Sequence, residues 1–259
     1  MNTTASSQST DVSLDWQQEP FEILRRRWNS VPAGLTSRLK TDEMASISDE
    51  ELLECWQHAV DEAISGPRGF PVRGWYHELY RPAMRGQKVL DVGCGLGLDG
   101  ISFARMGAAV TFVDILDANV ELVRRICDLM GIGSARFHVL DDLTSLDALD
   151  DDYDLMWCQG SLINAPADVI QREIQALLEH LPVGGRWIEL AYPESRWVRD
   201  GRPSFETWGE KTDGPGTPWM EWYDLAKLQA AFAPATFDTI LHFEFDQQNF
   251  NWFDLIRTG

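Results

Sequence analysis

The chain has 259 residues, of which 44% are hydrophobic and 24% charged, and this composition excludes a wholly disordered chain, a collagen-like repeat and a disulfide-dense miniprotein. Its 41 acidic and 22 basic residues give a formal net charge of -19, which disfavours nucleic acid as a partner because phosphates would be repelled. The four cysteines are widely spaced, no apolar run reaches about 18 residues, and the first residues lack a signal-peptide pattern. We therefore expect a reduced, soluble, cytoplasmic protein with no membrane span.

The N-terminal third of the chain predicts helices and no strand. Residues 1–18 are rich in Ser, Thr, Asn and Gln, which is typical of a flexible tail. Residues 19–82 predict a helical cap, in which a helix begins at Ser48 because Glu51 follows at capping-box spacing. An aromatic stretch over residues 70–82 predicts a further helix.

Residues 83–259 predict a single domain in which strands and helices alternate. Such alternation is typical of a parallel sheet covered by helices on both faces. The expected strands of this part are 88–93, 108–115, 135–141, 153–159 and 185–192.

The end of the chain breaks this alternation. Residues 193–220 contain many Pro and Gly residues and predict an irregular lid, and residues 217–232 predict a helix. The last two strands, over residues 241–248 and 250–257, are so close in sequence that we expect an antiparallel hairpin.

The most specific segment is VLDVGCGLGLDG, which places small residues between an expected strand and an expected helix. Gly93, Gly95 and Gly97 allow the backbone to approach a ligand closely. The helix that follows presents unpaired amides, and Asp91 adds a carboxylate that can face a positive group. This combination favours a cofactor that carries an amino acid over one that carries a pyrophosphate.

Acidic residues also end the next two expected strands. Asp114 ends the second strand, where a carboxylate can accept hydrogen bonds from both hydroxyls of a ribose. Asp141 and Asp142 end the third strand, within reach of an adenine amino group, although Asp142 could instead belong to a solvated acidic run. These acids predict a nucleoside site at one edge of the sheet.

In this order of motifs, residues 70–259 resemble the class I S-adenosylmethionine-dependent methyltransferases. The resemblance implies an α/β, Rossmann-like fold with a seven-stranded, mostly parallel sheet, a C-terminal antiparallel hairpin and the N-terminal helical cap. It also implies S-adenosylmethionine as cofactor, with Arg73 pairing with its carboxylate, Tyr76 covering the site and Leu143 packing on the adenine ring. The cofactor-binding residues that it implies are Arg73, Tyr76, Asp91, Gly93, Cys94, Gly95, Gly97, Asp114, Ile115, Asp141, Asp142, Leu143, Gln159, Gly160 and Ser161.

Candidate catalytic residues are fewer, because methyl transfer from a sulfonium depends mainly on alignment and exclusion of water. A hydroxyl acceptor needs a general base, whereas an amine must only be neutral when it binds. We consider His77 first as that base, and Glu194 and Tyr192 after the fifth strand as further candidates. Glu194 could instead be an ordinary exposed carboxylate in a loop, without a catalytic role. No His and carboxylate spacing predicts a metal site.

We therefore expect methylation of a hydroxyl or amine on a small-molecule acceptor. A protein methyltransferase with a basic partner, a non-catalytic member of the family and a homodimer all stay open. Gly95, Gly97 and Gly100 with Asp114 also satisfy the dinucleotide pattern of a nicotinamide-dependent oxidoreductase. Asp91 would repel a pyrophosphate there, and a dinucleotide site does not need the acidic pair at 141 and 142. The tryptophan-rich segment 193–223 either packs the lid or recognises an amine or sugar ring.

Overall fold

The computed structural model describes residues 15–29 and 41–259 of the chain. The seven strands are β1 (Lys88–Val92), β2 (Ala109–Asp114), β3 (Arg136–Val139), β4 (Leu155–Gln159), β5 (Arg186–Ala191), β6 (Phe237–Phe245) and β7 (Phe250–Arg257). The helices before β1 are α1 (Pro20–Trp28), α2 (Thr41–Ser46), α3 (Asp49–Val60), η1 (Asp61–Ser65), η2 (Phe70–Gly74), α4 (Trp75–Tyr80) and η3 (Arg81–Ala83). The later helices are α5 (Leu98–Arg105), α6 (Asp117–Leu129), η4 (Leu143–Ala148), α7 (Ala167–Leu178), α8 (Glu194–Arg199), α9 (Phe205–Asp213) and α10 (Leu225–Phe232).

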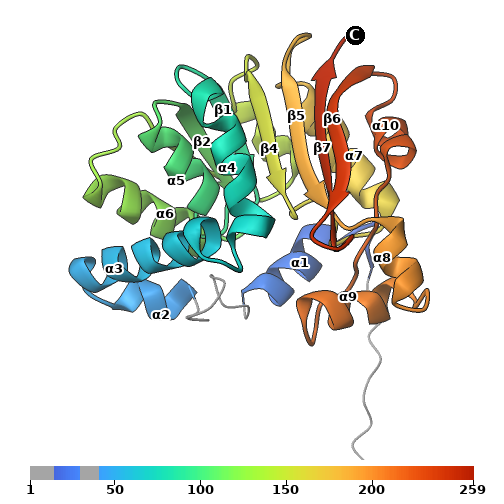
Figure 1. Ribbon diagram of the computed structural model, residues 1–259, viewed down its shortest axis with the longest axis horizontal. Helices are drawn as coiled ribbons and strands as arrows, with labels where there is room; N and C mark the ends of the chain where they lie inside the picture. Colours follow the sequence, from blue (N-terminus) through green and yellow to red (C-terminus); the bar gives the residue numbers. More distant parts are fainter. Residues whose placement is uncertain (1–14, 30–40) are drawn as a thin grey trace, which may run out of the picture.

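All seven strands form one sheet, in the order β3-β2-β1-β4-β5-β7-β6 (Figure 1). Strands β1 to β5 are parallel, whereas β7 is antiparallel to both β5 and β6. The hairpin therefore enters the sheet with its second strand inside and β6 at the edge. The expected fold class, including the C-terminal antiparallel hairpin, is confirmed.

Both faces of the sheet are buried, which explains why its central strands are apolar nearly throughout. On β4, Met156 and Cys158 belong to the core under α7 and α10, while Trp157 between them belongs to the core under α5 and α6. Side chains alternate between the faces of a strand, so one apolar run supplies both cores. Aromatic rings fill much of the second core, where Trp157 contacts Trp252 and Phe103.

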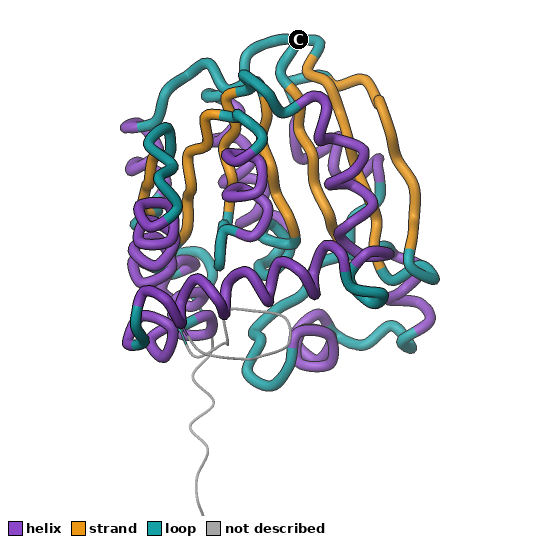
Figure 2. The backbone as a smooth tube through the Cα atoms, turned by 60° about the vertical axis from the view of Figure 1, so that its left-hand side comes forward, coloured by secondary structure: helices purple, strands orange, loops and turns teal. Residues whose placement is uncertain are grey.

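Helices gather at the carboxyl ends of the parallel strands. In Figure 1 the helices α1, α2, α3, α8 and α9 lie below the sheet, and Figure 2 shows helices crowding the same lower end of the strands. Strands β1 and β4 are neighbours here, and the chain leaves them in opposite directions along the sheet. Open α/β sheets bind ligands in the crevice at such a point, so the fold places a site beneath β1 and β4.

The predicted irregular lid over residues 193–220 is wrong in part, because this segment contains α8 and α9. Ser204 begins α9, and its hydroxyl accepts a hydrogen bond from the Thr207 amide at 3.3 Å. The helix predicted over residues 217–232 begins only at Leu225, because Asp224 caps it by accepting from the Lys227 amide at 2.7 Å. Local caps therefore fix where α9 and α10 begin, even though the segment is rich in Pro and Gly.

The N-terminal predictions have mixed outcomes. Most of the predicted tail, residues 1–14, lies outside the described residues. Residues 15–18 form a turn in which Trp16 makes an edge contact with Trp219 at 6.4 Å between ring centroids, so this part is not a free tail. The capping box at Ser48 is confirmed, since Ser48 and Glu51 exchange both hydrogen bonds.

Candidate functional site

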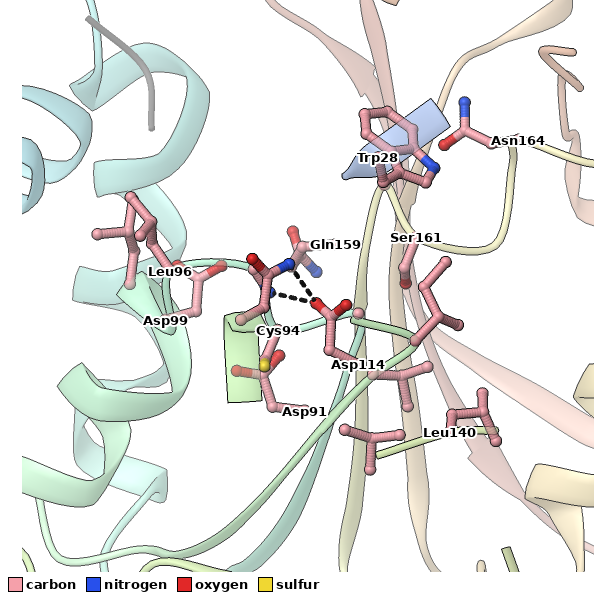
Figure 3. Close-up of a pocket in the computed structure, with 18 of the residues that line it drawn as sticks. Trp28, Asp91, Cys94, Leu96, Asp99, Asp114, Leu140, Gln159, Ser161 and Asn164 are labelled. Carbon is pink, nitrogen blue, oxygen red and sulfur yellow. Dashed lines mark hydrogen bonds between the residues drawn. The ribbon is translucent and has the colours of Figure 1, made fainter. Parts of the chain in front are cut away.

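A cavity of about 340 Å³ lies at the carboxyl ends of β1, β2 and β4, and Figure 3 shows side chains that point into it. Leu24 and Trp28 of α1 also line it. This volume falls within the range of small-molecule sites, about 300 to 1,000 Å³. The residues that line it are Leu24, Trp28, Thr41, Arg73, Asp91, Val92, Gly93, Cys94, Gly95, Leu96, Leu98, Asp99, Val113, Asp114, Ile115, Asn119, Leu140, Gln159, Gly160, Ser161, Asn164 and Glu173.

Two glycines after β1 shape the floor of the cavity. Gly93 has φ +70°, and a Cβ added there would lie 2.5 Å from the Ser161 Cβ, so the turns after β1 and β4 touch at this point. Gly95 has φ +54°, and a Cβ added there would meet nothing within 4 Å. The first glycine allows two turns to pack together, and the second leaves open space in which a ligand can approach the backbone.

Asp114 holds this turn in place. Its Oδ2 accepts hydrogen bonds from the Gly95 amide at 2.9 Å and from Asn119 Nδ2 at 3.1 Å, both drawn as dashed lines in Figure 3. Its Oδ1 accepts from the Leu116 amide at 2.9 Å. These donors use most of the acceptor capacity of the carboxylate, which has about four acceptor sites. Asp114 is buried, and burial raises the pKa of its carboxyl.

A second buried carboxylate, Asp99 in the first turn of α5, organises the opposite wall. Arg73 Nη1 donates to Asp99 Oδ2 at 2.6 Å, and Trp157 Nε1 donates to the same oxygen at 3.3 Å. Burial opposes ionisation of Asp99, but Arg73 and then His77 outweigh it and hold the pKa of that carboxyl below its usual range. Asp99 raises the pKa of the Arg73 guanidinium in turn, against the effect of burial. The sequence reasoning missed Asp99, although its place in the first turn of the helix after the glycines was a signal.

Polar groups without partners lie at the end of β4. Both amide atoms of Gln159 and the Ser161 hydroxyl are buried, and no described residue forms a hydrogen bond with them. Buried polar atoms in native proteins nearly always have a partner. A ligand in this cavity would supply the missing hydrogen bonds.

The charges of the cavity suit a cation better than a phosphate. Asp91 is 4% exposed, and burial together with the nearby Asp99 carboxylate raises its pKa well above the usual range. Asp91, Asp99 and Asp114 outnumber Arg73, the one basic residue among the described residues that line the cavity. A sulfonium or ammonium group would be stabilised here, whereas a pyrophosphate would meet like charge.

Comparison with known proteins indicates a methyltransferase domain around this site. Residues 89–185 match the family described as methyltransferase domain. A ubiquinone biosynthesis O-methyltransferase of Methylocella silvestris is 39% identical over 66 residues, which cover 25% of this chain and 26% of that protein. The mitochondrial ubiquinone biosynthesis O-methyltransferase of Schizosaccharomyces pombe is 28% identical over 110 residues, which cover 42% of this chain and 39% of that protein.

A solved structure resembles the chain over nearly its whole length. The magnesium protoporphyrin IX methyltransferase from Synechocystis, solved with bound SAH, covers 94% of this chain and 96% of its own at 18% identity and a TM-score of 0.53. Residues 89–185 form a methyltransferase domain, and the comparisons support a class I S-adenosylmethionine-dependent methyltransferase. The alignments span about a quarter to two fifths of the two curated relatives. They therefore support a shared methyltransferase domain and do not transfer those proteins' whole activities to this chain.

Within this methyltransferase fold, the cavity brings together most of the predicted cofactor residues. Asp91, Gly93, Cys94, Gly95, Asp114, Ile115, Gln159, Gly160, Ser161 and Arg73 all line it. Gly97 does not, because it packs against the core, where an added Cβ would lie 3.0 Å from both Ile101 and Val123. Its φ of +64° serves the start of α5.

The predicted adenine contacts lie elsewhere. Asp141 is exposed and pairs with Arg25 at 3.7 Å, while Asp142 caps η4 by accepting from the Thr144 amide at 2.9 Å. Leu143 packs against the core under α7. Leu140 lines the cavity in their place, because the chain turns away directly after it.

His77 and Tyr76 lie behind the cavity wall. Both are 1% exposed, and both contact Asp99, with His77 Nε2 at 2.7 Å from Oδ1 and the Tyr76 hydroxyl at 3.3 Å. Neither is among the described residues that line the cavity, so a bound acceptor could not reach them. The geometry therefore does not support His77 as the general base or Tyr76 as a cover of the cofactor.

Tyr192 and Glu194, the other predicted catalytic residues, also lie outside the cavity lining. The Tyr192 hydroxyl donates to Asp213 Oδ1 at 2.8 Å, and burial raises its pKa further above neutrality. Glu194 is exposed at the start of α8, as its alternative interpretation expected. The described residues contain no group of three or more His, Cys, Asp or Glu side chains placed to hold a metal. Within the same ranges, every helix is too short or too polar to cross a membrane.

Proposed function

We propose that this protein transfers a methyl group from S-adenosylmethionine to a hydroxyl or amine of a small molecule. The observation that carries the proposal is the cavity beneath β1 and β4, which is lined by Asp114 and by the unpartnered side chains of Gln159 and Ser161. The names of the curated relatives favour a hydroxyl, since both are O-methyltransferases.

The residues of the cavity fit the proposed cofactor. Asp114, which lines the cavity, would accept a hydrogen bond from a ribose hydroxyl, and Ile115 and Leu140 offer apolar contacts to an adenine ring. Asp91 and Arg73 stand where an ammonium and a carboxylate could each meet an opposite charge. When bound, S-adenosylmethionine supplies a methyl group on a positively charged sulfur that is a good leaving group. The protein needs to align the acceptor with it and keep water away.

Helix α1 provides the exclusion of water. Arg25 Nε donates to the Ile115 carbonyl at 3.1 Å, and its Nη2 donates to the Leu140 carbonyl at 2.9 Å, so α1 is tied to the turns after β2 and β3. Leu24 and Trp28 of the same helix face the cavity. A cavity closed in this way supports a small acceptor over a protein side chain on a large partner. The net charge of -19 disfavours nucleic acid in addition.

Calorimetry with S-adenosylmethionine, S-adenosylhomocysteine and a nicotinamide dinucleotide tests the proposal. We expect the first two to bind and the dinucleotide to give no heat. Incubation with radiolabelled S-adenosylmethionine and a panel of small phenols, alcohols and amines then tests transfer. Binding of the dinucleotide alone would refute the proposed function.

A further inference from the structure

Glu173 of α7 is a carboxyl group in the cavity that neither the sequence reasoning nor the family comparison uses. It lines the cavity together with Ser161 and Asn164. No hydrogen bond or ion pair within residues 15–29 and 41–259 reaches its carboxyl group. Most other acids of the cavity have donors, as Asp114 and Asp99 show.

The described groups that interact with Glu173 are a thiol and a tyrosine hydroxyl, which other carboxyls also affect. Its carboxyl interacts with the Cys158 thiol of β4 and with the Tyr223 hydroxyl of the segment before α10, and Glu189 of β5 acts on the same two groups. Lys227 of α10 lies 5.0 Å from the Tyr223 ring but pairs with Glu221. Burial raises the pKa of Glu173 to about 7. A carboxyl with that pKa is ionised in a useful fraction of molecules near neutral pH and can also hold a proton.

We propose that Glu173 is the general base of the methyl transfer and that the acceptor group is a phenolic hydroxyl. This inference rests on the proposed function. Gln159 and Ser161, the unpartnered polar groups at the end of β4, would hold the acceptor beside Glu173. As the acceptor oxygen bonds to the methyl carbon, the carbon–sulfur bond of the donor breaks with its electron pair left on sulfur. The hydroxyl proton moves to the Glu173 carboxylate and later to water.

The chemistry of the base selects a phenol over an aliphatic alcohol. A phenolic hydroxyl has a pKa of about 10, so its proton is within reach of a base near 7, whereas aliphatic alcohols are far weaker acids. Trp28 and Leu24 provide apolar surface for an aromatic ring on the covering side of the cavity. An acceptor that carries a carboxylate would be repelled by Glu173.

The test compares two probe acceptors at pH 8, catechol, which is mostly neutral there, and 4-nitrophenol, which is a much stronger acid, is largely ionised there and needs little help from a base. Glu173→Gln should lower kcat with catechol by about 100-fold or more, the usual range for a general base, but change the rate with 4-nitrophenol by less than ~5-fold. Glu173→Asp, which keeps the carboxylate, should recover part of the catechol rate. Glu179→Gln removes an exposed carboxylate at the end of the same helix and should change neither rate.

Three results would overturn the inference, and calorimetry separates them. Equal losses with both probes in Glu173→Gln would mean that Glu173 supports the site without taking a proton. Binding of S-adenosylmethionine by the native protein without methylation of either phenol would refute the phenolic acceptor and leave the proposed function standing. Absence of S-adenosylmethionine binding in the native protein would refute the proposed function itself.

Discussion

Arg73 and Asp99 join the N-terminal helices to the sheet through one ion pair, with Arg73 Nη1 at 2.6 Å from Asp99 Oδ2. Arg73 belongs to η2 and Asp99 to the first turn of α5. Asp99 is 5% exposed and Arg73 23%, so water screens this pair much less than a surface pair. The position of the cavity wall therefore depends on a buried charge in each segment.

Asp99→Asn should destabilise the protein, because it leaves the Arg73 charge without its carboxylate. Breaking a buried pair costs about 3–5 kcal/mol, and we expect about 3 kcal/mol because Arg73 keeps some contact with water. Urea unfolding at pH 7 measures this loss. Glu78→Gln, which breaks an exposed pair with Arg81, serves as the control and should cost about 0–1 kcal/mol.

The stability lost in Asp99→Asn should depend on pH. Arg73 and His77 lower the pKa of Asp99, so its contribution is complete above the unfolded pKa of about 4 and is lost as the pH falls through the folded value. The stability gap between the native protein and Asp99→Asn should stay constant from pH 7 to about 4 and narrow as the pH falls below 4. A gap that does not narrow below pH 4 would contradict the assignment.

Gly93→Ala should abolish cofactor binding, while Gly131→Ala should not. The two glycines have nearly the same φ, +70° and +69°, so a side chain at either position carries a similar backbone cost, of about 1–2 kcal/mol. Only at Gly93 does the added Cβ meet another atom, the Ser161 Cβ at 2.5 Å, whereas Gly131 has open space. Thermal unfolding and calorimetry of both variants separate the steric effect from the backbone effect. Equal cofactor affinities in the two would rule out the contact of the two turns as the cause.

Arg25→Ala should speed release of the cofactor, because α1 would lose its hydrogen bonds to the Ile115 and Leu140 carbonyls. We expect affinity to fall by about 10-fold or more, since each hydrogen bond to a charged group is worth about 1.5–3 kcal/mol. Arg26→Ala is the matched control, because Arg26 pairs only with exposed Glu22 within the described residues. Stopped-flow measurement of cofactor release gives the result. Similar release rates in both variants would show that α1 does not close the cavity.

Asp114→Asn should weaken S-adenosylmethionine binding by about 10- to 100-fold, because one acceptor oxygen becomes a donor that faces the Gly95 or Leu116 amide. Asp117→Asn changes an exposed carboxylate at the start of α6 and should leave binding unchanged. Calorimetry at constant pH measures both affinities. Undiminished binding in Asp114→Asn would place the ribose away from this carboxylate.

Glu189→Gln should stabilise the protein at high pH. Glu189 is 1% exposed, it accepts from Trp187 Nε1 at 2.8 Å, and its Oε1 has no partner among the described residues. Burial raises the pKa of Glu189 to about 8, so ionisation in the folded state costs stability as the pH rises from about 4.5 towards 8. In denaturant unfolding, the free energy of unfolding of the variant should rise relative to that of the native protein between pH 5 and pH 9. A difference that does not change with pH would refute the raised pKa.

The segment from Asp91 to Gly97 predicted both the fold and the place of the site, because a strand, a glycine turn and a helix are local features. The pattern of apolar runs likewise predicted the strands, since each buried strand must supply both faces of the sheet. The prediction was poorer at residues 193–220, where α8 and α9 form despite the Pro and Gly content and Ser204 caps α9.

The acids of the site show most clearly what depends on tertiary structure. Asp141 and Asp142 follow β3 as predicted, yet the turn directs them to Arg25 and to η4, and Leu140 takes the place in the cavity. Glu173 has no motif around it, and only the packing of α7 against β4 brings its carboxyl into the cavity.

The sequence by itself determined that a glycine turn and spaced acids lie at the carboxyl ends of parallel strands, because strand order and turn chemistry are set by short stretches of chain. The tertiary structure alone decided which acids face a ligand. Arg25 and Leu140 are 115 residues apart, and Arg73 and Asp99 are 26 apart, so these contacts form only when separate elements pack. The direction and solvation of a side chain depend on that packing, and they decide whether a carboxylate binds, holds the fold or takes a proton.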